Sequence, residues 1–380
     1  MQPMSAQPAP FDPPGPPEPF IPDYRRSVAA ILPALFGYTD ASWLPDAVRG
    51  ADSVVLVVID GLGWRAFDDA PGALPNLASL DGGPISTVIP ATTSAALTSI
   101  TTGCTPAEHG ITGFRVALDD TVLNVLRWQS ETRGVRAPDP AALQPNEPFF
   151  GHRVPVVAKS EHQGSGFSAA HLRGGTFTGW RSPSTLVEHC RRAALDGAPF
   201  VYAYYPGVDE VAHEFGLHDG AYEAELTFAD DLVGRLRRAL PPGAALIVTA
   251  DHGQVDLEPE AWIELPGDVA LLVARQAGDA RFRHLYARPG AAADLAVACS
   301  ESFGAVAWTP TRRELLDQAW LGESATRATP ARLGDVVLVP HQPVGFVDPA
   351  LPRERNLRSA HGAATAAEML VPLLAGRGGA

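Results

Sequence analysis

Acids and histidines that follow apolar, strand-like runs are the residues of this chain best suited to chemistry. Asp60 follows VVLVVI, Asp209 and His213 follow FVYAYY after a short turn, and Asp251 and His252 follow ALIVTA. Ligands of open α/β sheets bind beyond the carboxyl ends of the strands, so we expect these side chains to meet at one sheet edge. Three acids there would repel one another, and a bound cation removes that conflict.

Two further segments extend this set. His361 adds a third imidazole near the C-terminus, and PATTSAALTSITTG places Thr92 and Thr93 at the start of a predicted helix. A threonine hydroxyl is a poor nucleophile until a base or a metal removes its proton. Backbone N–H groups at a helix N-terminus also favour an anionic oxygen. The set therefore indicates a metal-activated alcohol that attacks a phosphoryl-type ester, although spacing alone does not choose between Thr92 and Thr93.

Each of these residues also has an ordinary structural explanation. A single Asp at a strand end is about as often a helix cap or a turn residue. Asp209 and His213 are four residues apart, so on a helix they share one face. They fit either two ligands of a zinc ion or an Asp–His pair on the surface. His361 alone is typical of a loop, and the two threonines alone are typical of a helix cap. Only the combination favours a metal site.

The elements that must position these residues alternate between strands and helices. Apolar strands are expected at 54–59, 200–205 and 244–250, with helices at 93–102 and 228–240. Uninterrupted β-branched strands are typical of a parallel sheet covered on both faces. The pattern predicts an α/β fold with a mostly parallel central sheet flanked by helices.

The domain prediction has three parts. Residues 1–22 are rich in proline and are expected to form a disordered or extended tail. Residues 23–255 and 336–380 form the α/β catalytic domain, and residues 256–335 form an inserted α+β cap. The apolar run at 335–340 is expected to return the chain to the main sheet.

Two other segments carry weaker signals. Residues 115–185 are expected to be irregular and to cover one edge of the site. The histidines in that segment, His152, His162 and His171, are more typical of solvated loop positions. His109, in PAEHGITG, is expected to be structural, and an apolar helix is expected after His361.

Composition limits the partners. The net charge of −14 disfavours nucleic acid polymers and anionic membranes, because both need a cationic face. Three scattered cysteines do not make a disulfide framework or a cysteine zinc site. The N-terminus lacks the pattern of a secretory signal, and no apolar run is long enough to span a bilayer. The expectation is a cytoplasmic protein that acts on a small phosphorylated substrate.

Five ordered motifs resemble the alkaline phosphatase superfamily, and most closely its nucleotide pyrophosphatase/phosphodiesterase branch. They are VVLVVIDGLGW, IPATTSAALTSITTGCTPAEHGITG, YYPGVDEVAHEFG, TADHGQVD and AHGAATAAEMLVPLL. Their order and spacing match the family across roughly residues 50–375, which is far more specific than any one motif.

The resemblance implies an alkaline-phosphatase-like fold with a site for two zinc ions, other divalent metals being alternatives. One ion would be held by Asp209, His213 and His361. The other would be held by Asp60, Asp251, His252 and the nucleophile, which the motif alignment places at Thr93. The implied activity is hydrolysis of a phosphodiester or pyrophosphate bond through a covalent threonyl intermediate.

Some positions depart from the family pattern. An asparagine that many eukaryotic members have three residues beyond the nucleophile is Ala96 here, so some other group, such as backbone N–H, must contact the phosphoryl oxygen instead. The usual proline before Asp209 is Val208. The sulfatase signature is absent.

Three alternatives remain open at this point. The same site fits a phosphate monoester or a phosphonate, although no Arg in the nucleophile motif mildly favours diesters. A phosphoryl transferase is a weaker option, because such relatives generally use serine. A non-catalytic metal-binding protein is the alternative from another class. The leaving group is not readable from the sequence.

Overall fold

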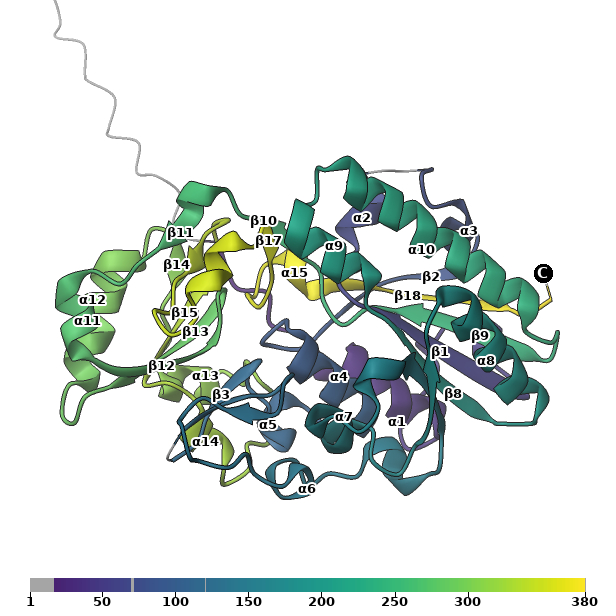
Figure 1. Cartoon of the computed structure of the whole chain (residues 1–380), viewed down its shortest axis with the longest axis horizontal. Coiled ribbons are helices and arrows are strands. Elements are labelled where there is room, and N and C mark those ends of the chain that lie inside the picture. The colour runs from purple at the N-terminus through teal and green to yellow at the C-terminus, as the bar shows by residue number, and fades with distance from the viewer. Residues whose placement is uncertain (1–16, 70–71, 120, 380) are drawn as a thin grey trace, which may run out of the picture.

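The computed structural model describes residues 17–69, 72–119 and 121–379. Its larger body is built on a seven-stranded sheet in the order β2-β18-β9-β1-β8-β6-β7 (Figure 1). The strands are β1 (Ser53–Ile59), β2 (Asp81–Ser86), β6 (Pro155–Lys159), β7 (Thr176–Trp180), β8 (Phe200–Tyr205), β9 (Ala244–Thr249) and β18 (Leu370–Arg377). The neighbours from β9 to β7 are parallel, and β18 runs antiparallel to both β9 and β2. The predicted mostly parallel sheet is confirmed.

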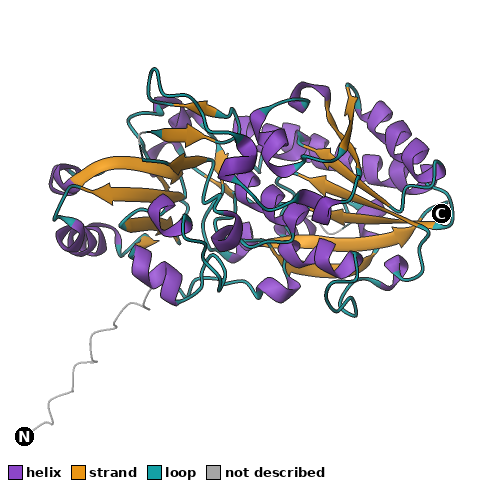
Figure 2. Ribbon diagram, turned by 90° about the horizontal axis from the view of Figure 1, so that it is seen from below, coloured by secondary structure: helices purple, strands orange, loops and turns teal. Residues whose placement is uncertain are grey.

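Helices cover both faces of this sheet (Figures 1 and 2). On one face α8 (Pro183–Leu195) and α10 (Gly220–Ala239) pack together, and on the other lie α1 (Ile31–Leu35), α4 (Thr93–Thr102) and α7 (Gly166–His171). The side chains from Val55 to Ile59 in β1 are fully buried between these layers. Each such side chain contributes about 1.5–3 kcal/mol by leaving water, which explains the apolar run without alternation.

A second body carries an antiparallel four-stranded sheet in the order β12-β13-β15-β14. Its strands are β12 (Val273–Asp279), β13 (Phe282–Ala287), β14 (Ala307–Trp308) and β15 (Val336–Pro340). Helices α11 (Gly267–Leu272) and α12 (Ala292–Phe303) pack together beside it at the far end of the molecule (Figure 1). Helix α13 (Arg312–Asp317) follows β14.

The remaining elements are short. A three-stranded sheet joins β3 (Arg115–Ala117), β4 (Val122–Asn124) and β5 (Gln129–Ser130), and two-stranded pairs join β10 (Val255–Asp256) to β17 (Ser359–Ala360) and β11 (Trp262–Ile263) to β16 (Gly345–Phe346). The short helices are α2 (Arg65–Asp69), α3 (Pro75–Ala78), α5 (Pro106–His109), α6 (Pro140–Leu143), α9 (Gly207–Phe215), α14 (Thr329–Arg332) and α15 (Ala366–Met369).

The structure corrects two strand assignments. The run at 335–340 does not return to the main sheet, because β15 pairs with β13 and β14 in the smaller one. Residues 115–185 are not irregular throughout, because β6 and β7 extend the main sheet at its edge. An apolar run indicates a buried strand but does not say which sheet it joins. The division into domains itself stays a prediction.

The predicted apolar helix after His361 is wrong for most of its length. Only α15 is helical, and Leu370–Arg377 then forms β18 between β9 and β2. Pro372 lacks the N–H that a helix interior needs. A strand buried on both faces has the same uninterrupted apolar sequence as a buried helix.

The tail prediction is only partly open to comparison, because residues 1–16 lie outside the described part. Residues 17–22 form no helix or strand but are attached to the body rather than disordered. The Phe20 N–H donates to the Ala364 carbonyl at 2.8 Å, and the Trp308 indole donates to the Pro17 carbonyl at 2.7 Å. Among the described residues, no helix combines the length and apolarity needed to cross a membrane.

Candidate active site

The carboxyl ends of three neighbouring strands bring the predicted acids together. Asp60 is the first residue after β1, Asp209 lies in the first turn of α9 after β8, and Asp251 follows β9 by one residue. The Asp209 N–H donates to the Asp60 carbonyl at 3.1 Å, which fixes the start of α9 against the end of β1. The parallel pairing of β1 with both β8 and β9 therefore positions all three carboxylates.

One group of side chains gathers around His252. Its Nε2 lies 3.4 Å from Asp60 Oδ1, 3.5 Å from Asp251 Oδ2 and 3.1 Å from the Thr93 hydroxyl oxygen. Asp60, Asp251 and His252 each offer a ligand atom within 4.8 Å of the others. The chain turns at Asp251, so these adjacent residues face the same point.

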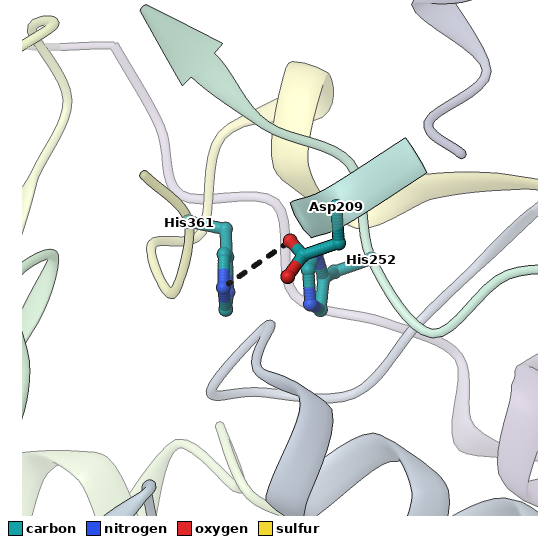
Figure 3. Close-up of side chains that lie close together, drawn as sticks. All are labelled: Asp209, His252 and His361. Carbon is teal, nitrogen blue, oxygen red and sulfur yellow. Dashed lines mark ion pairs between the residues drawn. The ribbon is translucent and has the colours of Figure 1, made fainter. Parts of the chain in front are cut away.

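A second group gathers around Asp209. Its Oδ1 lies 3.3 Å from His213 Nε2 and 3.9 Å from His361 Nε2. Figure 3 shows the Asp209 carboxylate directed toward His361 and His252, whose rings stack at 3.5 Å with an interplanar angle of 11°. The set within 4.8 Å here is Asp209, His252 and His361, so His252 belongs to both groups. His213 is not part of this set, but its Nε2 contacts Asp209 Oδ1, which is a member.

All three imidazoles turn the same nitrogen toward the protein. His213 Nδ1 lies 2.8 Å from the Ser359 carbonyl, His252 Nδ1 lies 3.2 Å from the Gly253 carbonyl, and His361 Nδ1 lies 2.8 Å from the Ala91 carbonyl. A carbonyl only accepts, so each Nδ1 donates and each Nε2 keeps its lone pair. Metal-binding histidines are oriented in this way.

The acids are buried without enough hydrogen-bond donors. Asp60 Oδ1 and Asp251 Oδ2 are buried and have no hydrogen-bond partner. Burial, and then the charges of Asp251 and Asp209, raise the pKa of Asp60 well above its usual range. Burial raises the pKa of Asp251 to about 7 and lowers the pKa of His361 to about 3. Unpaired carboxylate oxygens facing neutral imidazoles are a donor set that fits divalent cations.

The two threonines have different surroundings. Thr92 donates to Asp279 Oδ1 at 2.7 Å and is 1% exposed, while the Thr93 hydroxyl lies beside His252. Thr92 precedes α4 without capping it, so the first N–H groups of α4 have no side-chain partner from this residue. Ala96 is fully buried and does not replace the missing asparagine.

Two glycines allow the backbone to come this close. A Cβ on Gly253 would lie 2.1 Å from the Ala367 carbonyl oxygen, and a Cβ on Gly61 would lie 2.3 Å from Gln254 Nε2. Gly61 also has a φ of +73°, which favours glycine. At Gly253 close packing, rather than the freedom to turn, is what requires glycine.

Three residues that support the site were missed in the sequence. The Tyr204 hydroxyl donates to Asp60 Oδ2, Gln254 Nε2 donates to Asp209 Oδ1 at 2.9 Å, and Asp279 accepts from Thr92. Gln254 follows the Asp251 motif directly, which is a usable signal. Tyr204 is hidden inside an apolar strand, and Asp279 lies in the second body with no motif around it.

The histidines outside the metal set have two outcomes. His109 is 1% exposed and bonds Ser99 Oγ at 2.9 Å, so the structural interpretation is confirmed. His171 is 4% exposed and lines a cavity beside Thr93, so its interpretation as a solvated loop residue is wrong. Helix α7 packs against α4 and α6, and the His171 ring stacks on Phe167 at 4.0 Å.

Two cavities open on either side of Thr93. The sheet cavity, of about 310 Å³, lies between α4, α7 and the end of β8 and is lined by Tyr202, Tyr204 and Phe167 among others. The cap cavity, of about 250 Å³, is lined by Phe114, Asp279, Glu354, Leu357 and His361 among others. Both are also lined by Thr93, Leu126 and Asp209.

Solved structures of known proteins share this fold. Murine ectonucleotide pyrophosphatase/phosphodiesterase 5 is similar at 16% identity with a TM-score of 0.66, covering 85% of this chain and 87% of that one. An inactive variant of that protein in complex with AMP gives a TM-score of 0.63 at 16% identity, covering 86% and 88%. Phosphonoacetate hydrolase from Sinorhizobium meliloti 1021, in complex with phosphonoacetate, gives 0.61 at 18% identity, covering 86% and 91%. At these identities the likeness concerns the fold.

No curated protein matches the sequence. The family model described as type I phosphodiesterase/nucleotide pyrophosphatase matches residues 54–364, which include every predicted site residue. This chain therefore belongs to the type I phosphodiesterase/nucleotide pyrophosphatase family of hydrolases, within the alkaline phosphatase superfamily.

Proposed function

We propose that this protein hydrolyses phosphodiester or pyrophosphate bonds in a small substrate, with two zinc ions and Thr93 as the nucleophile. The observation that carries the proposal is the Thr93 hydroxyl, 3.1 Å from His252 Nε2 and beside two buried carboxylate oxygens that have no partner. The family membership supports the reaction type.

The donor sets support two ion positions. Asp60, Asp251 and His252, with Thr93, would hold one ion. Asp209, His213 and His361 would hold the other, because the Nε2 atoms of both histidines lie within 4 Å of Asp209 Oδ1. Bound ions supply Lewis acidity, which lowers the pKa of the nucleophile and stabilises charge on the phosphoryl oxygens. Zinc suits nitrogen and oxygen donors of this kind.

The chain's own groups would act in sequence. Thr93 Oγ1 gives its proton to solvent and forms a bond to phosphorus, while the bond from phosphorus to the leaving oxygen breaks and that oxygen takes a proton from solvent. The first N–H groups of α4 contact the phosphoryl oxygen, which compensates for Ala96. The intermediate is a phosphodiester of Thr93 that keeps the second substituent of the substrate. Water then attacks its phosphorus, the bond to Thr93 Oγ1 breaks, and Thr93 regains its hydroxyl as the monoester leaves.

A phosphonate is the second candidate substrate. A solved neighbour with the same fold is a phosphonoacetate hydrolase in complex with its substrate, whereas another neighbour holds AMP. The same nucleophile would serve either substrate, so the difference between them rests on the walls of the two cavities.

The test is covalent trapping. We expect Thr93→Ala to abolish hydrolysis of bis(4-nitrophenyl) phosphate, and mass spectrometry of acid-quenched wild-type protein to find a 4-nitrophenyl phosphoryl group on Thr93. Thr92→Ser, which keeps the hydroxyl that bonds Asp279, should retain the label on Thr93. Full activity of a folded Thr93→Ala protein would reject the proposal.

A further inference from the structure

The two cavities beside Thr93 resemble each other in charge. Among the described residues, the linings of the sheet cavity and of the cap cavity contain neither Lys nor Arg. The sheet cavity has Glu161 and Glu210 in its wall, and the cap cavity has Asp279 and Glu354. Outside the metal ligands, the walls thus carry carboxylates.

Two cations pair with carboxylates of these walls. Lys159 Nζ lies 2.9 Å from Glu210 Oε1 and 3.2 Å from Glu161 Oε1, and it does not line the cavity. Arg283 Nη2 bonds Glu354 Oε2 at 2.7 Å and is fully buried. Arg283 is therefore closed off from a substrate, and Lys159, whose side chain is 28% exposed, is already engaged by two glutamates.

This arrangement limits the charge that a substrate can bring. Two divalent ions among Asp60, Asp209 and Asp251 would leave a small positive surplus at the reacting centre, which matches one phosphoryl negative charge. A further phosphate or carboxylate on the substrate would extend into either cavity and meet the glutamates. Like charges at short range repel, more strongly at the buried Glu354 than at Glu161 and Glu210, whose side chains are 64% and 54% exposed.

The walls are otherwise suited to neutral organic groups. Phe167 and Leu97 line the sheet cavity, and Phe114 and Leu357 line the cap cavity. Tyr202 also lines the sheet cavity, its side chain is 1% exposed, and its buried hydroxyl oxygen has no hydrogen-bond partner. A buried hydroxyl without a partner is a ready hydrogen-bond donor for a neutral polar substituent.

Leu126 stands where the cavities meet. It lines both of them and is 42% exposed. Its loop is held firmly, because the Val125 N–H donates to the Phe114 carbonyl at 2.8 Å and the Trp128 indole donates to the Pro138 carbonyl at 2.9 Å. The loop therefore presents Leu126 to whatever occupies the site.

We propose that the substrate is a phosphodiester with two organic substituents that carry no negative charge, one in each cavity, with Leu126 packed against both. This inference rests on the proposed function and selects within it. It disfavours polyphosphates, monoesters and carboxylated phosphonates, because each places an additional anion against Glu161, Glu210 or Glu354.

A matched pair of substrates tests the charge requirement. The 4-nitrophenyl esters of 4-carboxamidophenyl phosphate and 4-carboxyphenyl phosphate share a leaving group and differ mainly by one negative charge. We expect the carboxylate to lower kcat/KM by on the order of 10-fold or more. Calorimetry with Thr93→Ala should show the same preference in binding. Equal or faster hydrolysis of the carboxylate, or a preference for ATP, would overturn the inference.

Substitutions that reverse one charge test whether the carboxylates of the sheet cavity cause this preference for an uncharged substituent. Glu161, whose side chain is 64% exposed at the cavity wall, tolerates substitution, so we expect Glu161→Lys to narrow the carboxamide-to-carboxylate ratio several-fold. Glu301→Lys makes the same change of net charge on the exposed surface of α12 and should leave the ratio unchanged. An unchanged ratio in Glu161→Lys would contradict the assignment of the sheet cavity.

The outcomes separate the two proposals. If Thr93→Ala hydrolyses diesters like the wild type, the proposed function fails. If activity depends on Thr93 but the carboxylated ester is preferred, only the proposal of uncharged substituents fails.

Leu126→Ala should raise KM for the carboxamide ester several-fold, because Leu126 lines both cavities. Leu271→Ala, at a residue that is 73% exposed on α11, should not change KM. Equal KM values would exclude Leu126 from substrate contact.

Discussion

Neutral donors position the carboxylates of the site. The Tyr204 hydroxyl donates to Asp60 Oδ2, and Gln254 Nε2 donates to Asp209 Oδ1 at 2.9 Å. These contacts each occupy one oxygen, and Asp60 Oδ1 remains without a protein partner. A neutral donor fixes the direction of the carboxylate without cancelling the charge that a cation needs.

Removal of the Tyr204 hydroxyl tests whether it orients Asp60 for metal binding. Tyr204→Phe removes the hydroxyl beside Asp60 and keeps the ring, so we expect zinc affinity to fall by about 10–100-fold. Competition with a chromophoric chelator measures it. Tyr205→Phe is the matched control on the same strand, because the Tyr205 hydroxyl bonds Glu225 on α10 at 2.6 Å instead. The same affinity in both variants would contradict this role for Tyr204.

At the scale of elements, a buried ion pair joins the two bodies near His361. Arg281, in the turn between β12 and β13, donates from Nε and Nη2 to Glu368 of α15, both at 2.8 Å. Glu368 Oε1 also accepts from the Ala363 N–H at 2.9 Å. The loop that carries His361 is therefore wrapped around this carboxylate.

Breaking that pair should affect both stability and the metal site. Arg281→Met leaves a buried carboxylate unpaired, so we expect a loss of about 3–5 kcal/mol in the free energy of unfolding, with weaker zinc binding. Denaturant titration measures the first quantity. Arg313→Met breaks the exposed pair with Asp317 and should cost about 1 kcal/mol or less. Similar losses in the two variants would refute the argument.

The strands that lead to the site can be predicted from the sequence, whereas contacts between distant strands cannot. The strands β1, β8 and β9 and the acids that follow them were readable, because a buried parallel strand has an uninterrupted apolar sequence and ends at the binding edge. The apolar run of β15 predicts a strand but not the sheet that it joins, and the run of β18 was predicted as a helix, because a strand buried on both faces and a buried helix have the same uninterrupted apolar sequence. Asp279 comes from a distant strand to meet Thr92, and no local pattern reports such a contact.

The fold gathers the carboxylates of Asp60, Asp209 and Asp251 at the carboxyl ends of β1, β8 and β9, where their negative charges repel one another. Asp60 and Asp251 are 2% and 0% exposed, and burial raises the pKa of both. Without a cation the folded state must desolvate these acids at neutral pH. Bound ions would remove that cost, so metal binding and stability should be linked.

Removal of the bound metal is expected to destabilise the folded protein. Treatment with a chelator should lower the midpoint of urea unfolding, and zinc at 100 times its Kd should add about 2.7 kcal/mol for each independent site. Asp251→Asn, which removes one of the buried charges, should stabilise the metal-free protein relative to wild type and weaken the response to zinc. A midpoint that ignores both chelator and zinc would contradict the linkage.

The proposed two-zinc site can be tested by anomalous X-ray diffraction at the zinc edge, on crystals grown with zinc. It predicts two peaks beside Thr93, one among Asp60, Asp251 and His252 and the other among Asp209, His213 and His361, with ligand distances of about 2.0–2.2 Å. Peaks elsewhere, or fewer than two at full occupancy with these side chains paired to one another, would contradict it.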